Sequence, residues 1–350
     1  MRNFLLCSLF LISAFCCFGQ VSTTVSKKKE YSYDTNYYVS YYNKLALKLY
    51  GVVKSNRISI FDDFTDNRIN YEPNDRFNLG FGFSYKWANL DIALNFPFIN
   101  DDDDVFGETS RFDAQGNLYL RKFIIDANYQ RYSGYYVENP ETYIPNFQPD
   151  PSFPIRSDIS TFSIGIQSFY LFNNEHLSLR SSFLYNERQK RSAGSFIMGP
   201  YFLFFRLEAD ESIIPEEIRT QVNSVIDFST TRFINAGLNF GYVHTFVIKK
   251  RFFITPFVAV GFGTETRASN ALERDLELKE TIFSPNVSGR FAVGYNSDLY
   301  FVGFSILAET TGDVASRDPL LEYSINTARL FIGRRLEAPK FLKPKKKRRN

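Results

Sequence analysis

Apolar residues alternate with polar or small ones through much of this chain of 350 residues. In residues 76–87, RFNLGFGFSYKW, every second residue is aromatic or aliphatic, and those between are Asn, Gly, Ser or Lys. A period of two places successive side chains on opposite faces of a β-strand. The pattern recurs at residues 90–96, 112–120, 123–130, 162–172, 234–246 and 287–296. The chain is therefore predicted to be all-β.

The composition of the two strand faces separates two kinds of β architecture. In a soluble sandwich the inner face is apolar and the outer face is charged. Here the polar face is rich in Gly, Ser and Asn, and the apolar face ends in aromatic residues, which make up 17% of the chain. A polar interior, an apolar exterior and aromatic girdles are typical of membrane barrels. We predict an antiparallel transmembrane β-barrel of about 12 strands, within a range of about 10 to 14, rather than a soluble sandwich or lipocalin-like barrel.

The segments between strands alternate in length. Short turns are expected near Ala88, at residues 121–122 and 249–250, and longer polar loops at residues 99–110, 134–157, 264–284 and 309–322. Short turns are typical of the periplasmic side and long loops of the external side.

Residues 208–231 fit neither kind of connection. Pro215 begins a stretch typical of the first turn of a helix, so a short helical insert is predicted near 213–226. Bacterial barrels have an even number of strands, and the segments counted here give an odd number. Either residues 208–231 contain a further strand, or residues 44–62 are divided into strands incorrectly.

The N-terminal residues predict export. Arg2 precedes an apolar run from Phe4 to Phe18, which is too short for a spanning helix and typical of a signal peptide ending near Gly19. Lipidation at Cys16 or Cys17 is the alternative, but a lipobox has a small residue where Phe15 stands.

The expected mature chain lacks cysteine, because the three cysteines lie in or beside this leader. Disulfides, thiolate metal sites and a cysteine nucleophile are thereby excluded. The predicted organisation is a signal peptide (1–19), a polar periplasmic lead-in (20–43), the barrel (44–336) and a basic tail (337–350).

The tail carries seven Lys and Arg among its last eleven residues. An exported chain meets no nucleic acid, so the tail is expected to be solvated or to contact a periplasmic anionic polymer. Outer-membrane lipids and lipopolysaccharide are the expected partners of the barrel wall.

The two histidines do not predict a catalytic base. His176 falls at a short turn, and His244 shares the apolar face of its strand. No catalytic residue, cofactor or metal site is predicted, and the chain is not expected to be an enzyme.

The polar strand face carries charges expected to point into the lumen. They are Lys86, Asp91, Arg121, Asp126, Arg180 and Arg290. In a narrow barrel such charges pair across the interior and constrict it, whereas in a wide barrel they line a pore. We favour a largely constricted polar lumen.

Several segments resemble a family of outer-membrane-barrel-like proteins of Bacteroidota, known as domain of unknown function 4421. The resemblance runs from about residue 31 to 335, and the segments that carry it are Tyr33-Asp34-Thr35, Tyr71-Glu72-Pro73-Asn74, Arg121-Lys122-Phe123, Tyr129-Gln130-Arg131-Tyr132 and residues 186–196, NERQKRSAGSF. It implies an envelope barrel of unknown activity and supplies no catalytic residues.

Residues 186–194 form a charged turn between two strands. We hypothesise that this turn folds inward and that Arg188, Lys190 and Arg191 pair with acids such as Asp126. The expected function is a structural or binding barrel of the outer membrane. A passive porin-like channel is the alternative, and a lipid-modifying enzyme is the third hypothesis.

Overall fold

The computed structural model describes residues 32–62, 67–74, 77–85, 88–94, 102–144, 146–149, 152–223, 226–271, 276–312 and 320–339. The predicted signal peptide, most of the basic tail and Lys86 lie outside these residues. The chain from Tyr33 onward forms one compact unit, which is described here.

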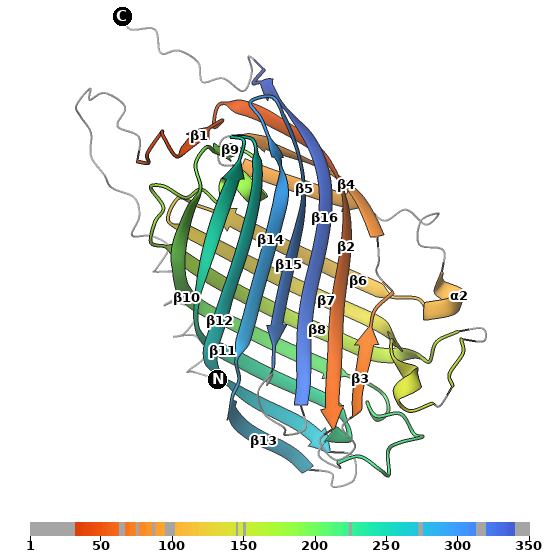
Figure 1. Cartoon of the computed structure of the whole chain (residues 1–350). Coiled ribbons are helices and arrows are strands. Elements are labelled where there is room, and N and C mark those ends of the chain that lie inside the picture. The colour runs from red at the N-terminus through yellow and green to blue at the C-terminus, as the bar shows by residue number, and fades with distance from the viewer. Residues whose placement is uncertain are drawn as a thin grey trace, which may run out of the picture. The chain divides into compact units, whose positions relative to one another are not determined.

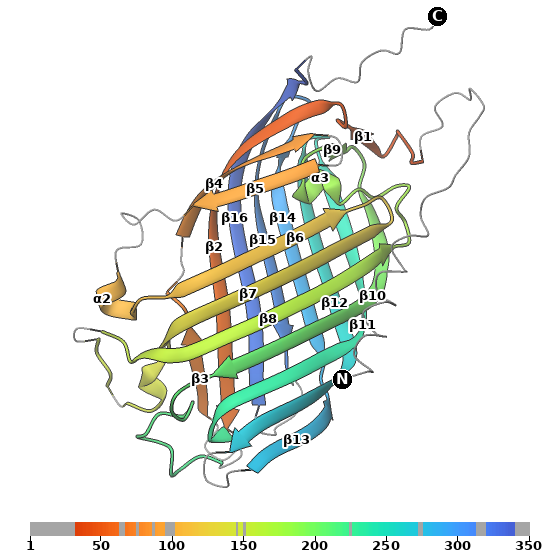
Figure 2. The same ribbon diagram turned by 180° about the vertical axis from the view of Figure 1, so that it is seen from behind.

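Ten strands close a ring through antiparallel pairing (Figures 1 and 2). They are β2 (Lys44–Asp62), β3 (Asn67–Glu72), β7 (Phe123–Val137), β8 (Ile155–Leu171), β10 (Ala193–Glu208), β11 (Phe228–Ile248), β12 (Phe252–Ala271), β14 (Asn286–Asn296), β15 (Tyr300–Thr311) and β16 (Leu320–Glu337). Other strands extend the wall: β4 (Phe77–Tyr85) on β2, β5 (Ala88–Leu94) on β4, β6 (Ser110–Tyr119) on β7, and β13 (Leu276–Phe283) on β12.

The remaining elements are short. β1 (Tyr38–Ser40) pairs with β9 (Glu187–Gln189) in a separate two-stranded sheet. The helical segments are α2 (Asp103–Phe106), η1 (Pro140–Thr142) and α3 (Arg180–Phe183). No helix in the described ranges is long and apolar enough to cross a membrane.

The first and last long strands close the ring. β16 pairs with β2 from Leu320 opposite Phe61 to Glu337 opposite Lys44. The predicted antiparallel β-barrel is therefore confirmed, although its closed ring has ten strands with others attached, rather than about twelve. The expected loop at 264–284 is mostly strand, because β12 runs on to Ala271 and pairs there with β13.

The outer face of the wall is apolar, as the alternation predicted. On β8, Ile164 and Ile166 are exposed, while Ser163 before them and Gln167 after them are buried. Phe196 is 70% exposed on the same outer surface. Such a continuous exposed apolar surface is typical of a barrel that faces lipid.

The interior is not uniformly polar, which corrects the predicted polar lumen. The inward residues of β8 run from Ile159 through Ser163 and Gln167 to Phe169 and Leu171. Ile159 belongs to an apolar cluster at the long-loop end, and Phe169 and Leu171 belong to another at the short-turn end. A polar layer lies between two apolar clusters, so packed side chains close the interior near both ends.

The helical insert predicted near 213–226 is wrong for the described part of that loop. Residues 213–223 form turns, with hydrogen bonds such as Ile218 N to the Pro215 carbonyl at 3.2 Å. Ile213, Ile214 and Ile218 are buried in the long-loop cluster. Burial of these side chains outweighs the local helix signal of the proline.

Candidate functional site

The segment between β8 and β10 folds back against the barrel at the short-turn end. It carries α3 and β9, and β9 pairs with β1 from the N-terminal lead-in, with Tyr38 opposite Gln189. We call residues 33–41 and 172–192 the plug. The expected inward fold of the charged turn is present, and residues 33–41 of the lead-in are part of the same structure.

Apolar side chains hold the plug in place. Leu177 and Leu179 are buried in the cluster that includes Phe169 and Phe257. Tyr185 stacks on Phe301, with ring centroids 5.0 Å apart. Burial raises the pKa of Tyr185, so its ring stays neutral.

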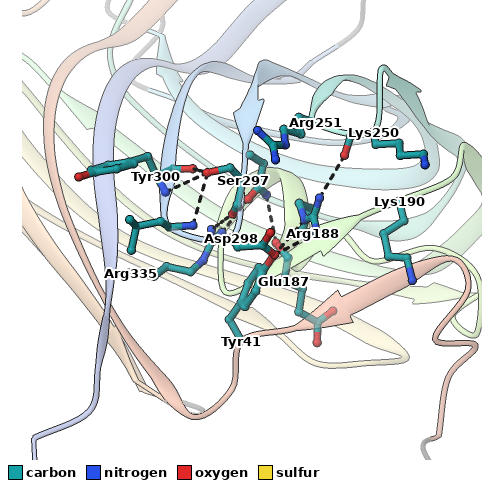
Figure 3. A network of polar contacts seen from close by, with 12 residues as sticks. Tyr41, Glu187, Arg188, Lys190, Lys250, Arg251, Ser297, Asp298, Tyr300 and Arg335 are labelled. Carbon is teal, nitrogen blue, oxygen red and sulfur yellow. Dashed lines mark hydrogen bonds and ion pairs between the residues drawn. The ribbon is translucent and has the colours of Figure 1, made fainter.

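Arg335 of β16 ties the plug to the wall (Figure 3). It is 1% exposed, and its Nε donates to the Tyr185 carbonyl at 3.0 Å. Its terminal nitrogens donate to the Ser297 carbonyl and, at 2.7 Å, to Oδ1 of Asn296. One guanidinium therefore satisfies acceptors from the plug and from the β14–β15 turn.

A second contact lies on the more exposed side of the plug (Figure 3). Tyr41 donates its hydroxyl to Oδ1 of Asp298 at 2.5 Å, and Arg188 reaches the same oxygen at 3.0 Å. Hydrogen bonding from Tyr41 lowers the pKa of Asp298, with a further contribution from the charge of Arg188. Burial and the bond to Asp298 raise the pKa of Tyr41 to about 12.

A buried carboxylate organises the inner side of the plug. Glu187 is 2% exposed, lies 3.3 Å from Arg121 and 3.8 Å from Arg180, and accepts from Ser178. Arg121 also donates to the hydroxyl of Tyr38. This acid pairs with two of the basic residues predicted to face the lumen.

The polar layer contains a second charge group. Arg290 pairs with Asp126 and lies 3.8 Å from Glu309. Its guanidinium carbon also stands 4.9 Å from the ring centre of Phe257. The group spans the interior from β7 to β14 and β15, as expected of charges that pair across a narrow barrel.

The predicted lumen residues therefore do not form one cluster. Asp126 lies with Arg290, Arg121 and Arg180 lie around Glu187, and Asp91 binds Lys48 at 2.8 Å and Arg329 at 3.4 Å. The structure does not describe Lys86.

The hypothesis that the turn residues pair with lumen or loop acids holds for Arg188, which pairs with Asp298 of the β14–β15 turn, but not for Asp126. Arg188 contacts Asp298, Lys190 donates to the Thr35 carbonyl at 2.6 Å, and Arg191 lies over the Tyr37 ring. Pairing with Asp126 was wrong, because that carboxylate is held by Arg290 and by Asn117 at 2.7 Å.

Sequence reasoning missed Glu187, Glu309, Lys48, Arg329 and Arg335. Glu187 directly precedes Arg188, the first of the turn residues singled out. Glu309 falls in the loop predicted at residues 309–322, whereas β15 continues to Thr311. Lys48, Arg329 and Arg335 sit on strands whose alternation could have placed them on the inner face.

Neither histidine approaches the interior charge groups. His244 lies against Phe246 on β11, with ring centroids 4.2 Å apart. His176 lies 3.9 Å from Asp34 in the plug.

The chain matches one family model, described as a domain of unknown function, DUF4421, over residues 32–335. The chain belongs to this family. The resemblance seen in the sequence is thereby confirmed. The family model is described only as a domain of unknown function, so membership supports the barrel fold and assigns no activity. No curated protein matches the chain.

Solved structures similar to the DUF4421 barrel are outer-membrane proteins of low identity. The outer membrane protease OmpT from Escherichia coli is 7% identical at a TM-score of 0.40, covering 84% of this chain and 97% of that one. The β domain of the Bordetella autotransporter BrkA is 10% identical at a TM-score of 0.34, covering 84% and 100%. The translocator domain of NalP from Neisseria meningitidis is 6% identical at 0.34, covering 83% and 88%. Similarities at this level carry no argument about activity.

Proposed function

We propose that this DUF4421 protein is an outer-membrane barrel that does not conduct solutes and has a structural or binding role. The observation that carries the proposal is that side chains close the interior near both ends and across the polar layer. The plug covers the short-turn end, and the Arg290 group crosses the polar layer. At the long-loop end, Phe205, Phe233 and Tyr323 are almost fully buried in one cluster. A porin keeps an aqueous channel that such filling does not leave.

Outer-membrane lipids and lipopolysaccharide are the proposed neighbours of the wall. The exposed outer face of β8, β10 and their neighbours is apolar, which fits lipid rather than water. We propose that the basic C-terminal tail meets an anionic polymer on the periplasmic side, because Lys and Arg cluster there.

Planar-bilayer recording tests the closed lumen directly. The purified full chain is expected to give no stable single-channel steps. Its insertion is checked in parallel by heat-modifiable gel migration, in which a folded barrel migrates differently before boiling. Regular conductance steps from protein that passes this check would overturn the proposal and favour a passive channel.

A further inference from the structure

Two neighbouring wall strands lack sheet pairing on the edges that face each other. In the described residues, β5 pairs with β4 only and β6 with β7 only, and Figure 2 shows the two strands running across the same part of the wall. Backbone groups that face hydrocarbon without a partner each cost several kcal/mol. The wall between β5 and β6 therefore needs a neighbour that can offer polar atoms.

A cavity of about 640 Å³ lies at this seam, which we call the β5–β6 cavity. It is lined by Asp91 and Ala93 of β5, by Arg111 and Asp113 of β6, and by residues of the opposite inner wall. Its volume falls in the range of about 300–1,000 Å³ that holds small molecules. Gly116 of β6 also borders open space, since a Cβ there would meet nothing within 4 Å.

The inner wall of the β5–β6 cavity carries more basic than acidic side chains. Lys54, Arg111 and Arg329 face two acids, Asp91 and Asp113, so the lining has a net charge of +1. Lys54 binds Asp113 at 2.7 Å, and Arg329 lies 3.4 Å from Asp91. Arg111 donates to the Asn78 amide at 3.1 Å. The net positive charge of this lining favours an anionic head group.

Hydrogen bonding in this wall is incomplete. In the described part of the chain, Asp91 Oδ1, Asp113 Oδ1, Thr327 Oγ1 and Arg329 Nε are buried without a hydrogen-bond partner. All four residues line the β5–β6 cavity. Buried polar atoms are nearly always satisfied, and of these four only the arginine nitrogen and the threonine hydroxyl can donate to an anionic head group.

The outer rim of the cavity is apolar. Leu90, Ile92 and Phe112 alternate with the inward residues and are exposed on the outer face, with Phe112 at 60%. A polar, net-basic interior behind an apolar rim matches a molecule with an anionic head and a hydrocarbon tail.

We propose that the β5–β6 cavity binds the head group of an anionic amphiphile that enters sideways from the membrane. A carboxylate or phosphate head lies near Arg111 and Arg329, and the acyl chain leaves over Leu90, Ile92 and Phe112. The proposal rests on the proposed membrane location, but not on the closed lumen. Bilayer conductance and amphiphile binding can therefore fail independently.

Photolabelling of the full-length protein in detergent micelles tests the site. The probes are a diazirine-bearing long-chain fatty acid, a diazirine-bearing phosphatidylglycerol and the fatty alcohol with the same chain. Labelled peptides are identified by mass spectrometry. We expect an anionic probe to label residues 88–94 and 110–119 in preference to the alcohol. Comparison of the two anionic probes shows whether the ligand is a free fatty acid or a phospholipid.

Two variants probe the two parts of the site. Arg111→Gln removes a cation, and a charge-assisted hydrogen bond is worth about tenfold or more in affinity. Ala93→Trp fills the cavity and should lower affinity by at least about tenfold. The matched controls are Arg206→Gln on β10 and Ala236→Trp on β11, both on strands away from the seam, and both should bind like the parent chain.

Several results would overturn the proposal. These are equal labelling by the alcohol, labels spread over the whole apolar belt, and undiminished labelling in Arg111→Gln. Cross-linked dimers joined through β5 and β6 would instead show that a second copy covers the seam. Folding of each variant is checked by heat-modifiable migration, and if Ala93→Trp does not fold, Arg111→Gln alone decides.

Discussion

Replacement of Arg290 by methionine tests whether the interior charges hold the barrel together. The Arg290 side chain is 1% exposed and serves two carboxylates, Asp126 and Glu309. Its guanidinium also lies over Phe257 and Phe169. Methionine keeps much of the apolar stem but removes the charge and its donors.

The structure gives the expected magnitude of this change. Removal of one partner from a buried ion pair costs about 3–5 kcal/mol, because the remaining charge is left uncompensated. Here two acids lose the same cation, and loss of the ring contacts adds roughly 0.5–2 kcal/mol. We therefore expect Arg290→Met to lower the free energy of unfolding by at least about 4 kcal/mol.

Urea unfolding in lipid vesicles measures the effect, with the fluorescence of Trp87, the single tryptophan, as the signal. The matched control is Arg206→Met, since Arg206 pairs with Glu208 while both side chains are about half exposed. Surface pairs of this kind are worth about 0–1 kcal/mol. Equal losses in the two variants would refute the assignment of stability to the interior group.

A rescue variant separates lost charge from lost packing. Addition of Asp126→Asn and Glu309→Gln to Arg290→Met removes the stranded charges and should recover more than half of the lost stability. Absence of any recovery would show that packing around the arginine stem, rather than electrostatics, sets the cost.

Three further predictions concern the plug and the bulge in β7, where the register with β8 shifts between Ser133 and Tyr135. Tyr185→Ala removes the ring that stacks on Phe301 and should cost about 3–5 kcal/mol, as seen by urea unfolding. The lowered pKa of Asp298 means that its contribution is present at neutral pH and fades as the pH falls below about 4. Asp298→Asn should therefore shift the unfolding midpoint at pH 7 and shift it less as the pH falls below about 4; equal shifts at neutral and acidic pH would contradict the reasoning. Gly134→Ala should cost roughly 1–3 kcal/mol in the same assay, because φ is +91° and a Cβ would lie 2.2 Å from the Glu108 carbonyl oxygen.

The sequence predicted the wall well because strand alternation is a local property. Each residue's side follows from its parity once one neighbour is placed, so the outward positions of Phe81, Ile166 and Phe240 could be assigned directly.

The contents of the lumen could not be read in this way. Parity indicates that Asp126 faces inward, but its partner Arg290 is 164 residues away, and only the closed ring brings them together. Parity also does not distinguish a water-filled interior from a packed one. On β10 the inward Leu203 and Phe205 alternate with the outward Phe202 and Phe204, so neither face of this part of the strand stands out as polar.

The filled interior and the seam in the wall are physically connected. The ring between β3 and β7 closes through only two residue pairs, Tyr71 with Val137 and Glu72 with Tyr136. Tyr71 and Val137 both belong to the long-loop cluster, and the Tyr71 hydroxyl donates to the Ile213 carbonyl in the loop that covers this end. Packing across the interior thus holds the wall where strand pairing is shortest. A barrel stabilised in this way does not need unbroken pairing around its circumference, which allows β5 and β6 to leave an opening that faces the membrane.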